Sequence, residues 1–198
     1  MNFQNTLSFA KELDAQDELK HFRDQFYIPL VHGKEAIYFT GNSLGLQPKS
    51  TQDYVLNELE DWASFGVEGH FHARHPWLPY HENFPRLLSP IVGALENEIV
   101  VMNQLTVNLH LLMVSFYRPT PQRYKIICEA KAFPSDQYAF ESQVKYHGLD
   151  PDEAVIEISP RAGEHRIRTV EIFSAIKEQG ASTALVLFGG VNYYTGQF

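Results

Sequence analysis

The sequence lacks several features that whole classes of protein require. Its single cysteine, Cys128, excludes a disulfide within the chain, and its place in the apolar run 124–128 predicts a buried, reduced thiol. Basic runs are absent and the net charge is −8, which argues against a nucleic-acid or acidic-membrane partner, because phosphates need clustered Lys and Arg. The longest apolar stretches, such as Leu109–Val114, are far shorter than the ~20 residues that span a bilayer.

The N-terminal region is polar as far as Asp24 and has no apolar core of signal-peptide length. What is present is ordinary: 198 residues, of which 44% are apolar and 20% charged, enough for one domain or somewhat more. We therefore expect a soluble, cytoplasmic, globular protein.

The second half of the chain alternates short apolar segments with stretches of helical spacing. We expect strands at 99–102, 124–128, 155–158 and 184–188, and helices at 106–117, 135–147 and 170–179. This order is typical of βαβ units, so the predicted fold class is α/β, a mainly parallel sheet with helices on both faces. Such sheets usually carry more strands, which predicts a truncated architecture.

The first half shows helical spacing at 14–26, 50–65 and 80–93, with Asp14 and Asp17 as possible caps of the first helix. Pro85 and Pro90 must bend or break the third helix. A short strand is expected at 37–39, followed by the loop Gly41–Gly45.

The loop Gly41–Gly45 matches the pattern G-x-S-x-G, which in α/β-hydrolases carries a nucleophilic serine. That interpretation is weak because Leu46, Gln47 and Pro48 separate Ser43 from the next helix. A structural turn, or a loop that offers Asn42 or Ser43 to a ligand, fits the pattern better.

Four histidines lie within twelve residues, next to two glutamates: His70, His72, His75 and His81, with Glu68 and Glu82. Their spacing fits neither the H-E-x-x-H pattern nor a zinc finger, so we predict no metal site. Two alternatives remain, namely ordinary surface or packing histidines, or one histidine, His70 by preference, that hydrogen-bonds a substrate.

Two helix starts follow neighbouring strands of the predicted sheet. Thr106 can cap a helix or, with the free amides there, bind a phosphate. After the next strand, Phe133 can stack on a flat ring, and Ser135 or Asp136 can cap the following helix. Because ligands gather at the carboxyl ends of parallel strands, the pair indicates a site for a phosphorylated planar ring.

Four blocks of sequence, in this order and spacing, resemble the kynureninase family: Phe39–Pro48, Met102–Met113, Glu129–Asp136 and Gly190–Gln197. The resemblance implies a pyridoxal 5′-phosphate (PLP) enzyme of the aspartate-aminotransferase fold (fold type I), normally a homodimer. The implied reaction is hydrolysis of the Cβ–Cγ bond of kynurenine or 3-hydroxykynurenine. Its products are anthranilate or 3-hydroxyanthranilate and alanine, in tryptophan degradation and NAD biosynthesis.

The same resemblance implies roles for particular residues. Leu105 and Thr106 would hold the phosphate; Phe133 would stack on the pyridine ring, with Pro134, Ser135 and Asp136 completing that wall; Ser43 and His70 would lie near the substrate's aromatic ring. Gly189 stands where the family often has a serine. The family's Schiff-base lysine would lie beyond Phe198, so we expect the chain to be an N-terminal fragment that is inactive alone.

On this basis, residues 1–65 are expected to form a helical segment and substrate loop that contribute to the small domain or a dimer contact. Residues 66–198 would be the first half of the large PLP-binding domain. The alternatives are another PLP enzyme of the same fold, desulfurase-like or aminotransferase-like, and a non-catalytic truncated module.

Overall fold

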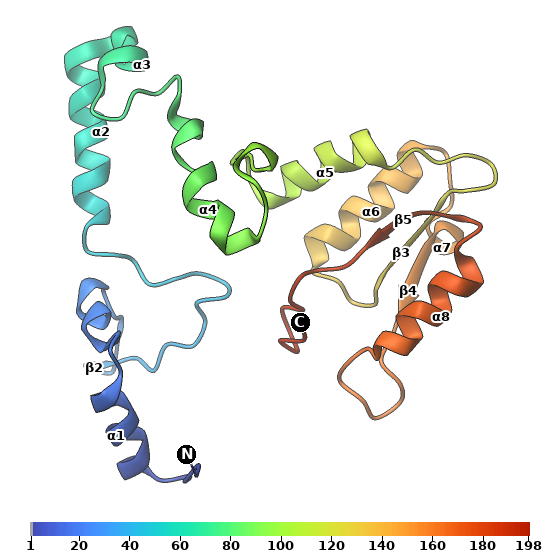
Figure 1. Cartoon of the computed structure of the whole chain (residues 1–198), viewed down its shortest axis with the longest axis horizontal. Helices are drawn as coiled ribbons and strands as arrows, with labels where there is room; N and C mark the ends of the chain where they lie inside the picture. Colours follow the sequence, from blue (N-terminus) through green and yellow to red (C-terminus); the bar gives the residue numbers. More distant parts are fainter. Residues whose placement is uncertain (1) are drawn as a thin grey trace. The chain divides into compact units, whose positions relative to one another are not determined.

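The computed structural model describes residues 2–198, which fall into two units, one reaching to Ile99 and the other covering Val100–Phe198. Figure 1 shows the elements of each unit, coloured along the chain. No helix among the described residues is both long and apolar enough to span a membrane.

The first unit consists of short helices and one small hairpin. Its elements are α1 (Leu7–Gln16), a 3-10 turn (Lys20–Gln25), β1 (Leu30–Val31), β2 (Lys34–Glu35), α2 (Thr51–Phe65), α3 (Gly69–His72) and α4 (Pro85–Val92), with further 3-10 turns at Gly66–Glu68, Tyr80–Asn83 and Glu96–Glu98. β1 and β2 pair antiparallel. The turn between them, His32 and Gly33, has positive φ angles of 51° and 76°, as tight hairpins require.

Local sequence explains where the helices of this unit begin and end. The helix expected at 14–26 is wrong in its bounds, because α1 begins after Thr6, whose hydroxyl accepts from the Phe9 amide, and ends at Gln16. Asp17 then accepts from the amide of Leu19 and starts a 3-10 turn instead. α2 matches the expected helix closely, and α4 begins at Pro85, the first helical position, where a missing N–H is harmless.

The second unit is a parallel three-stranded sheet covered by helices. Its elements are α5 (Leu105–Phe116), β3 (Lys125–Glu129), α6 (Pro134–Tyr146), α7 (Pro151–Ala154), β4 (Val155–Ile158), α8 (Thr169–Gln179) and β5 (Thr183–Leu187). The strand order is β4-β3-β5, and β3 pairs in parallel with both neighbours.

Side chains of the central strand alternate between two apolar layers. Ile126 and Cys128 pack with Met113, Phe140 and other side chains of α5 and α6, whereas Ile127 packs on the opposite face toward α8. Figure 1 shows α5 and α6 on one side of the sheet and α8 on the other. The predicted α/β class, with helices on both faces of a parallel sheet, is confirmed.

Two predicted strands are wrong. Residues 99–102 form no strand, and Val100, Val101 and Met102 keep exposed fractions of 65%, 39% and 45%. Residues 37–39 are likewise irregular, with Ile37 and Phe39 exposed. A strand needs a neighbour for its ladder of hydrogen bonds, and an apolar run without such a neighbour stays irregular.

The predicted boundary at residues 65 and 66 lies inside the first unit. The assignment of the two segments to parts of a larger enzyme stays a prediction.

Candidate active site

The helix starts in the second unit differ from the sequence prediction in how they are capped. α5 begins at Leu105 and α6 at Pro134, so the N-caps are Gln104 and Phe133, neither with a side-chain cap bond. Thr106 therefore lies inside the first turn, and the cap predicted for it is wrong. The caps predicted for Ser135 and Asp136 are wrong for the same reason.

The start of α5 presents a hydroxyl and several amides without hydrogen-bond partners among the described residues. Among residues 2–198 its hydroxyl has no hydrogen-bond partner, and the amides of Leu105, Thr106 and Val107 precede the first helical bond, from Asn108 N to Gln104 O at 3.0 Å. Orphan amides and the positive end of the helix dipole attract an anion. A phosphate-sized anion can therefore be held by amides and a hydroxyl together.

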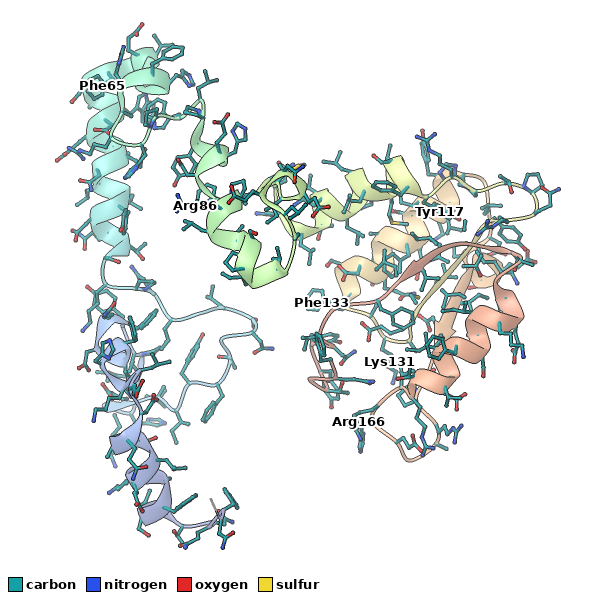
Figure 2. The ribbon with its side chains drawn as sticks, in the orientation of Figure 1. Phe65, Arg86, Tyr117, Lys131, Phe133 and Arg166 are labelled. Atoms are coloured by element: carbon teal, nitrogen blue, oxygen red, sulfur yellow. The ribbon has the colours of Figure 1, made fainter. Side chains whose placement is uncertain are left out.

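The start of α6 lies at the same end of the helix pair as the start of α5. His110 Nδ1 is 2.9 Å from Gln143 Nε2, and the rings of Tyr117 and His147 meet at 5.5 Å, so the two helices run in the same direction. Phe133, at the start of α6, is 49% exposed. Figure 2 shows Phe133 and Lys131 in the connection between β3 and α6. A helix start with unpaired amides and an exposed aromatic ring thus share one end of the helix pair.

The first turn of α6, which follows Phe133, carries a polar pair. Pro134 is the first residue of α6, and the Ser135 hydroxyl donates to the Asp136 carboxylate at 3.2 Å. Both side chains are half-buried.

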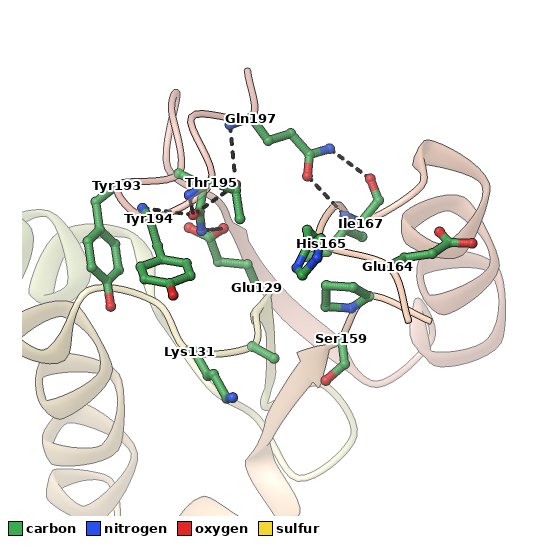
Figure 3. Close-up of a pocket in the computed structure, with 13 residues that line it drawn as sticks. Glu129, Lys131, Ser159, Glu164, His165, Ile167, Tyr193, Tyr194, Thr195 and Gln197 are labelled. Carbon is green, nitrogen blue, oxygen red and sulfur yellow. Dashed lines mark hydrogen bonds between the residues drawn. The ribbon is translucent and has the colours of Figure 1, made fainter. Parts of the chain in front are cut away.

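A turn after β5 contacts Phe133. The ring of Tyr193 lies edge-on to Phe133, with centroids 5.1 Å apart and planes at 82°. Asn192 organises the turn: its Oδ1 accepts from Tyr194 N, Thr195 N and the Thr195 hydroxyl at 2.9–3.0 Å. Its Nδ2 donates to Glu129 Oε2 at 2.8 Å (Figure 3).

Beside this turn lies a cavity of about 510 Å³ that sequence reasoning missed. Loops at the carboxyl ends of all three strands line it, including Glu129, Lys131, Ser159, His165, Asn192 and Tyr194 (Figure 3). The asparagine that opens the turn after a predicted strand was the available signal, because Asn favours such turns. Lys131 has φ 57°, a left-handed conformation that is uncommon outside glycine.

Gly189 touches the same network. A Cβ added there would come within 3.3 Å of Glu129 Oε1, so a larger residue at this position would crowd the carboxylate that anchors Asn192.

Ser43 and His70 lie in the first unit. Ser43 belongs to a turn in which its amide and that of Leu44 donate to Thr40 O at 2.9 and 3.1 Å, and Tyr38 OH donates to Leu44 O at 2.6 Å. No strand leads directly into the loop, because β2 ends at Glu35, and no helix starts at Ser43, so the hydrolase elbow is excluded.

His70 sits on α3 against an anchored tryptophan. The rings of His70 and Trp77 meet edge-on at 5.5 Å, and Trp77 Nε1 donates to Glu58 Oε2 at 2.9 Å. A Cβ on Gly69 would lie 2.5 Å from the Trp77 ring, so this close approach requires glycine.

Arg74, which follows α3, forms hydrogen bonds with two acidic residues of α2. Its amide donates to the buried Asp61 at 2.7 Å and its guanidinium to Glu60 at 2.6 Å. The Glu60 bond raises the pKa of Arg74 above its usual value.

Across residues 2–198, no three His, Cys, Asp or Glu side chains come together as metal ligands would. His72 Nε2 lies 3.8 Å from Glu68 Oε2.

Cys128 is fully buried, as predicted. Burial raises the pKa of its thiol to about 12, with Glu157 and Glu129 adding to the effect. A thiol held in the protonated form is a packing residue and not a nucleophile.

The comparison with known proteins identifies the relatives of this chain. No protein-family model matches it. It is 63% identical over 197 residues to the kynureninase of Flavobacterium psychrophilum and 50% identical over 200 residues to that of Homo sapiens. These alignments cover 100% and 95% of this chain. This chain is homologous to the kynureninases.

The kynureninase resemblance of the four sequence blocks is thereby confirmed. A third kynureninase, from Myxococcus xanthus, is 56% identical over 196 residues, which is 98% of this chain. The chain spans about half the length of the kynureninases it matches, 46% of the proteins from Flavobacterium and Myxococcus and 43% of the human one.

Proposed function

We propose that this chain forms part of a kynureninase. In that protein PLP assists hydrolysis of the Cβ–Cγ bond of kynurenine or 3-hydroxykynurenine to an anthranilate and alanine. The observation that supports the proposal is the start of α5, with its unpaired amides, at the same end of a helix pair as the exposed ring of Phe133, in a homologue of kynureninases. This arrangement fits a phosphorylated planar ring.

Different residues of the second unit would bind different parts of the cofactor. Leu105 and Thr106 would hold the phosphate through their amides and the Thr106 hydroxyl. Phe133 would cover one face of the ring, because its edge-on contact with Tyr193 leaves at least one face of Phe133 uncovered by that neighbour. Pro134, Ser135 and Asp136 would complete the wall. When bound, PLP supplies an electron sink for carbanion chemistry.

The residues of the first unit would bind the substrate. Ser43 offers a hydroxyl in a turn, and His70 offers an imidazole that Trp77 orients. By similarity, both would lie near the aromatic ring of kynurenine. No lysine of this chain would form the Schiff base, so we expect these 198 residues alone to be inactive.

The same proposal extends to organisation. Residues 1–65 would serve the small domain or a dimer contact, residues 66–198 would belong to the large PLP-binding domain, and the enzyme would be a cytoplasmic homodimer. Its partner would be the small-molecule substrate.

The test is PLP-dependent release of anthranilate, followed by fluorescence, from the protein expressed with its uninterrupted reading frame. Thr106→Ala should weaken PLP binding in equilibrium dialysis about 10-fold, because a hydrogen bond to a charged phosphate is lost. Thr169→Ala, at the start of α8, is the matched control and should change nothing.

Two results would overturn the proposal. Absence of PLP binding would exclude the cofactor site. Binding of PLP without release of either anthranilate would favour a desulfurase-like or aminotransferase-like enzyme of the same fold.

A further inference from the structure

Beyond the residues that would touch the cofactor, the turn at 192–197 fixes the surroundings of Phe133. We propose that Asn192 is a positioning residue: held by Glu129, it shapes this turn so that Tyr193 fixes the ring of Phe133 for a planar ligand. The part that concerns PLP rests on the proposed function.

The argument begins with Asn192, because its side chain joins two segments of the second unit. Its Nδ2 reaches Glu129 Oε2, at the end of β3, at 2.8 Å. Its Oδ1 accepts three hydrogen bonds from the two residues that follow Tyr193. One amide therefore sets both the shape of the turn and its distance from the central strand.

The turn is held at its other end as well. Gln197 exchanges two hydrogen bonds with Ile167, from Ile167 N to Oε1 at 2.9 Å and from Nε2 to Ile167 O at 2.7 Å (Figure 3). Asn192 N donates to Gln197 O at 2.8 Å, and Gly196 N donates to Asn192 O at 2.9 Å. Tyr193 thus stands in a closed turn with anchors on both sides.

Tyr193 in turn restricts the rotation of the Phe133 ring. A ring that is 49% exposed has few neighbours to restrict its rotation, and the edge-on contact at 5.1 Å is the aromatic contact it makes within residues 2–198. Aromatic pairs in this geometry attract by about 0.5–1.5 kcal/mol beyond their buried area. Loss of the pair should raise the dissociation constant of PLP about 2- to 10-fold if Phe133 covers the cofactor.

The experiment reads Phe133 directly, without the cofactor. Protein labelled with 4-fluorophenylalanine is examined by fluorine NMR, and Phe133→Leu identifies the Phe133 resonance by its loss. Asn192→Ala and Tyr193→Leu should shift this resonance in the same direction, whereas Tyr193→Trp, which keeps an aromatic ring without adding a labelled phenylalanine, should shift it less. Tyr146→Leu, an exposed tyrosine at the far end of α6, is the control.

A charge exchange separates positioning from a general loss of structure. Asn192→Asp keeps the oxygen acceptors of the turn but sets a carboxylate against Glu129, so the Phe133 resonance should shift. Adding Glu129→Gln restores an amide facing a carboxylate and should return the resonance toward its original position.

PLP affinity, measured by dialysis on the same variants, completes the test. Weaker binding in Asn192→Asp and its recovery in the double variant support the proposal. An unmoved Phe133 resonance in Asn192→Asp or Tyr193→Leu overturns it even if PLP binds normally. A parent protein that binds no PLP overturns the proposed function instead, while the resonance still decides whether Asn192 positions Phe133.

Discussion

Each of the two units of this chain is stabilised internally in a different way. The second buries a central strand, with Ile126, Ile127 and Cys128 fully covered between layers from helices on both faces. In the first, among residues 2–99, only Asp61, Gly69 and Ala73 are buried. The geometry of Phe133 therefore rests on a packed sheet, whereas that of His70 rests on hydrogen bonds and one tryptophan.

Both units nevertheless orient a candidate site residue in a similar way. In the first, Glu58 accepts from Trp77, whose ring meets His70 edge-on. In the second, Glu129 accepts from Asn192, whose turn sets Tyr193 edge-on to Phe133. A carboxylate anchors an aromatic contact in each case, and the difference lies in how firmly the surroundings hold that carboxylate.

The largest difference should appear when one aromatic side chain is removed from each unit of the 198-residue chain. Phe140 is 1% exposed in the layer between α6 and the sheet, so Phe140→Ala should lower the free energy of unfolding by about 3–5 kcal/mol. Trp62, on α2, is 65% exposed, and Trp62→Ala should cost about 0.5 kcal/mol or less. Urea titrations followed by circular dichroism measure both.

Equal costs for these two variants would contradict the comparison, because a large cost at Trp62 would mean that the exposed face of α2 is covered. Val55 and Leu59, which are 55% and 52% exposed, would then be covered with it.

The difference between the units also governs what could be predicted from sequence. β3, β4 and β5 were predicted to within one residue, because buried apolar runs between helices have few other solutions. The strand expected at 99–102 failed because apolar character alone does not supply a pairing neighbour. The helix expected at 14–26 failed because Asp17 bonds the backbone locally and ends the regular spacing.

For the candidate site, residue type was predictable and local geometry was not. Thr106 and Phe133 could be chosen because each follows an apolar run predicted as a strand. The run before Thr106 forms no strand, however, and the first helical residues are Leu105 and Pro134, one position earlier than predicted. Asn192 and Glu129 are 63 positions apart, and only the parallel pairing of β3 with β5 brings them together. No local pattern encodes that contact.

A second test uses the single cysteine as a probe of opening. Cys128 is 0% exposed and its pKa is raised to about 12, so almost no reactive thiolate exists at pH 8. Iodoacetamide should label it at least about 100-fold more slowly than in urea. Ser64→Cys, an exposed position on α2, should be labelled at the unfolded rate, and mass spectrometry distinguishes the two sites.

The same pKa sets a pH dependence. The folded chain keeps the Cys128 proton up to about pH 12, while the unfolded chain loses it near pH 9. The contribution of the protonated Cys128 thiol to the free energy of unfolding is therefore complete below pH 9 and is lost as the pH rises through 12. Burial also raises the pKa of Tyr117, which adds to the loss of stability at high pH. Replacing Cys128 with alanine should therefore reduce this slope in a urea series between these pH values, and an unchanged slope would contradict the contribution of the thiol.

The smallest effect sharpens the comparison from the side of the first unit. A methyl group on Gly69 would lie 2.5 Å from the Trp77 ring, so Gly69→Ala must displace that ring from Glu58 and His70. Overpacking of this kind costs about 1–3 kcal/mol. Gly41→Ala, where no atom lies within 4 Å, should cost less and leave Trp77 in place. In a background with Trp62 replaced by phenylalanine, the fluorescence emission of Trp77 reports the surroundings of that ring. The emission should shift to the red in Gly69→Ala and stay unchanged in Gly41→Ala. Equal spectra would mean that the added methyl group is accommodated without displacement of Trp77.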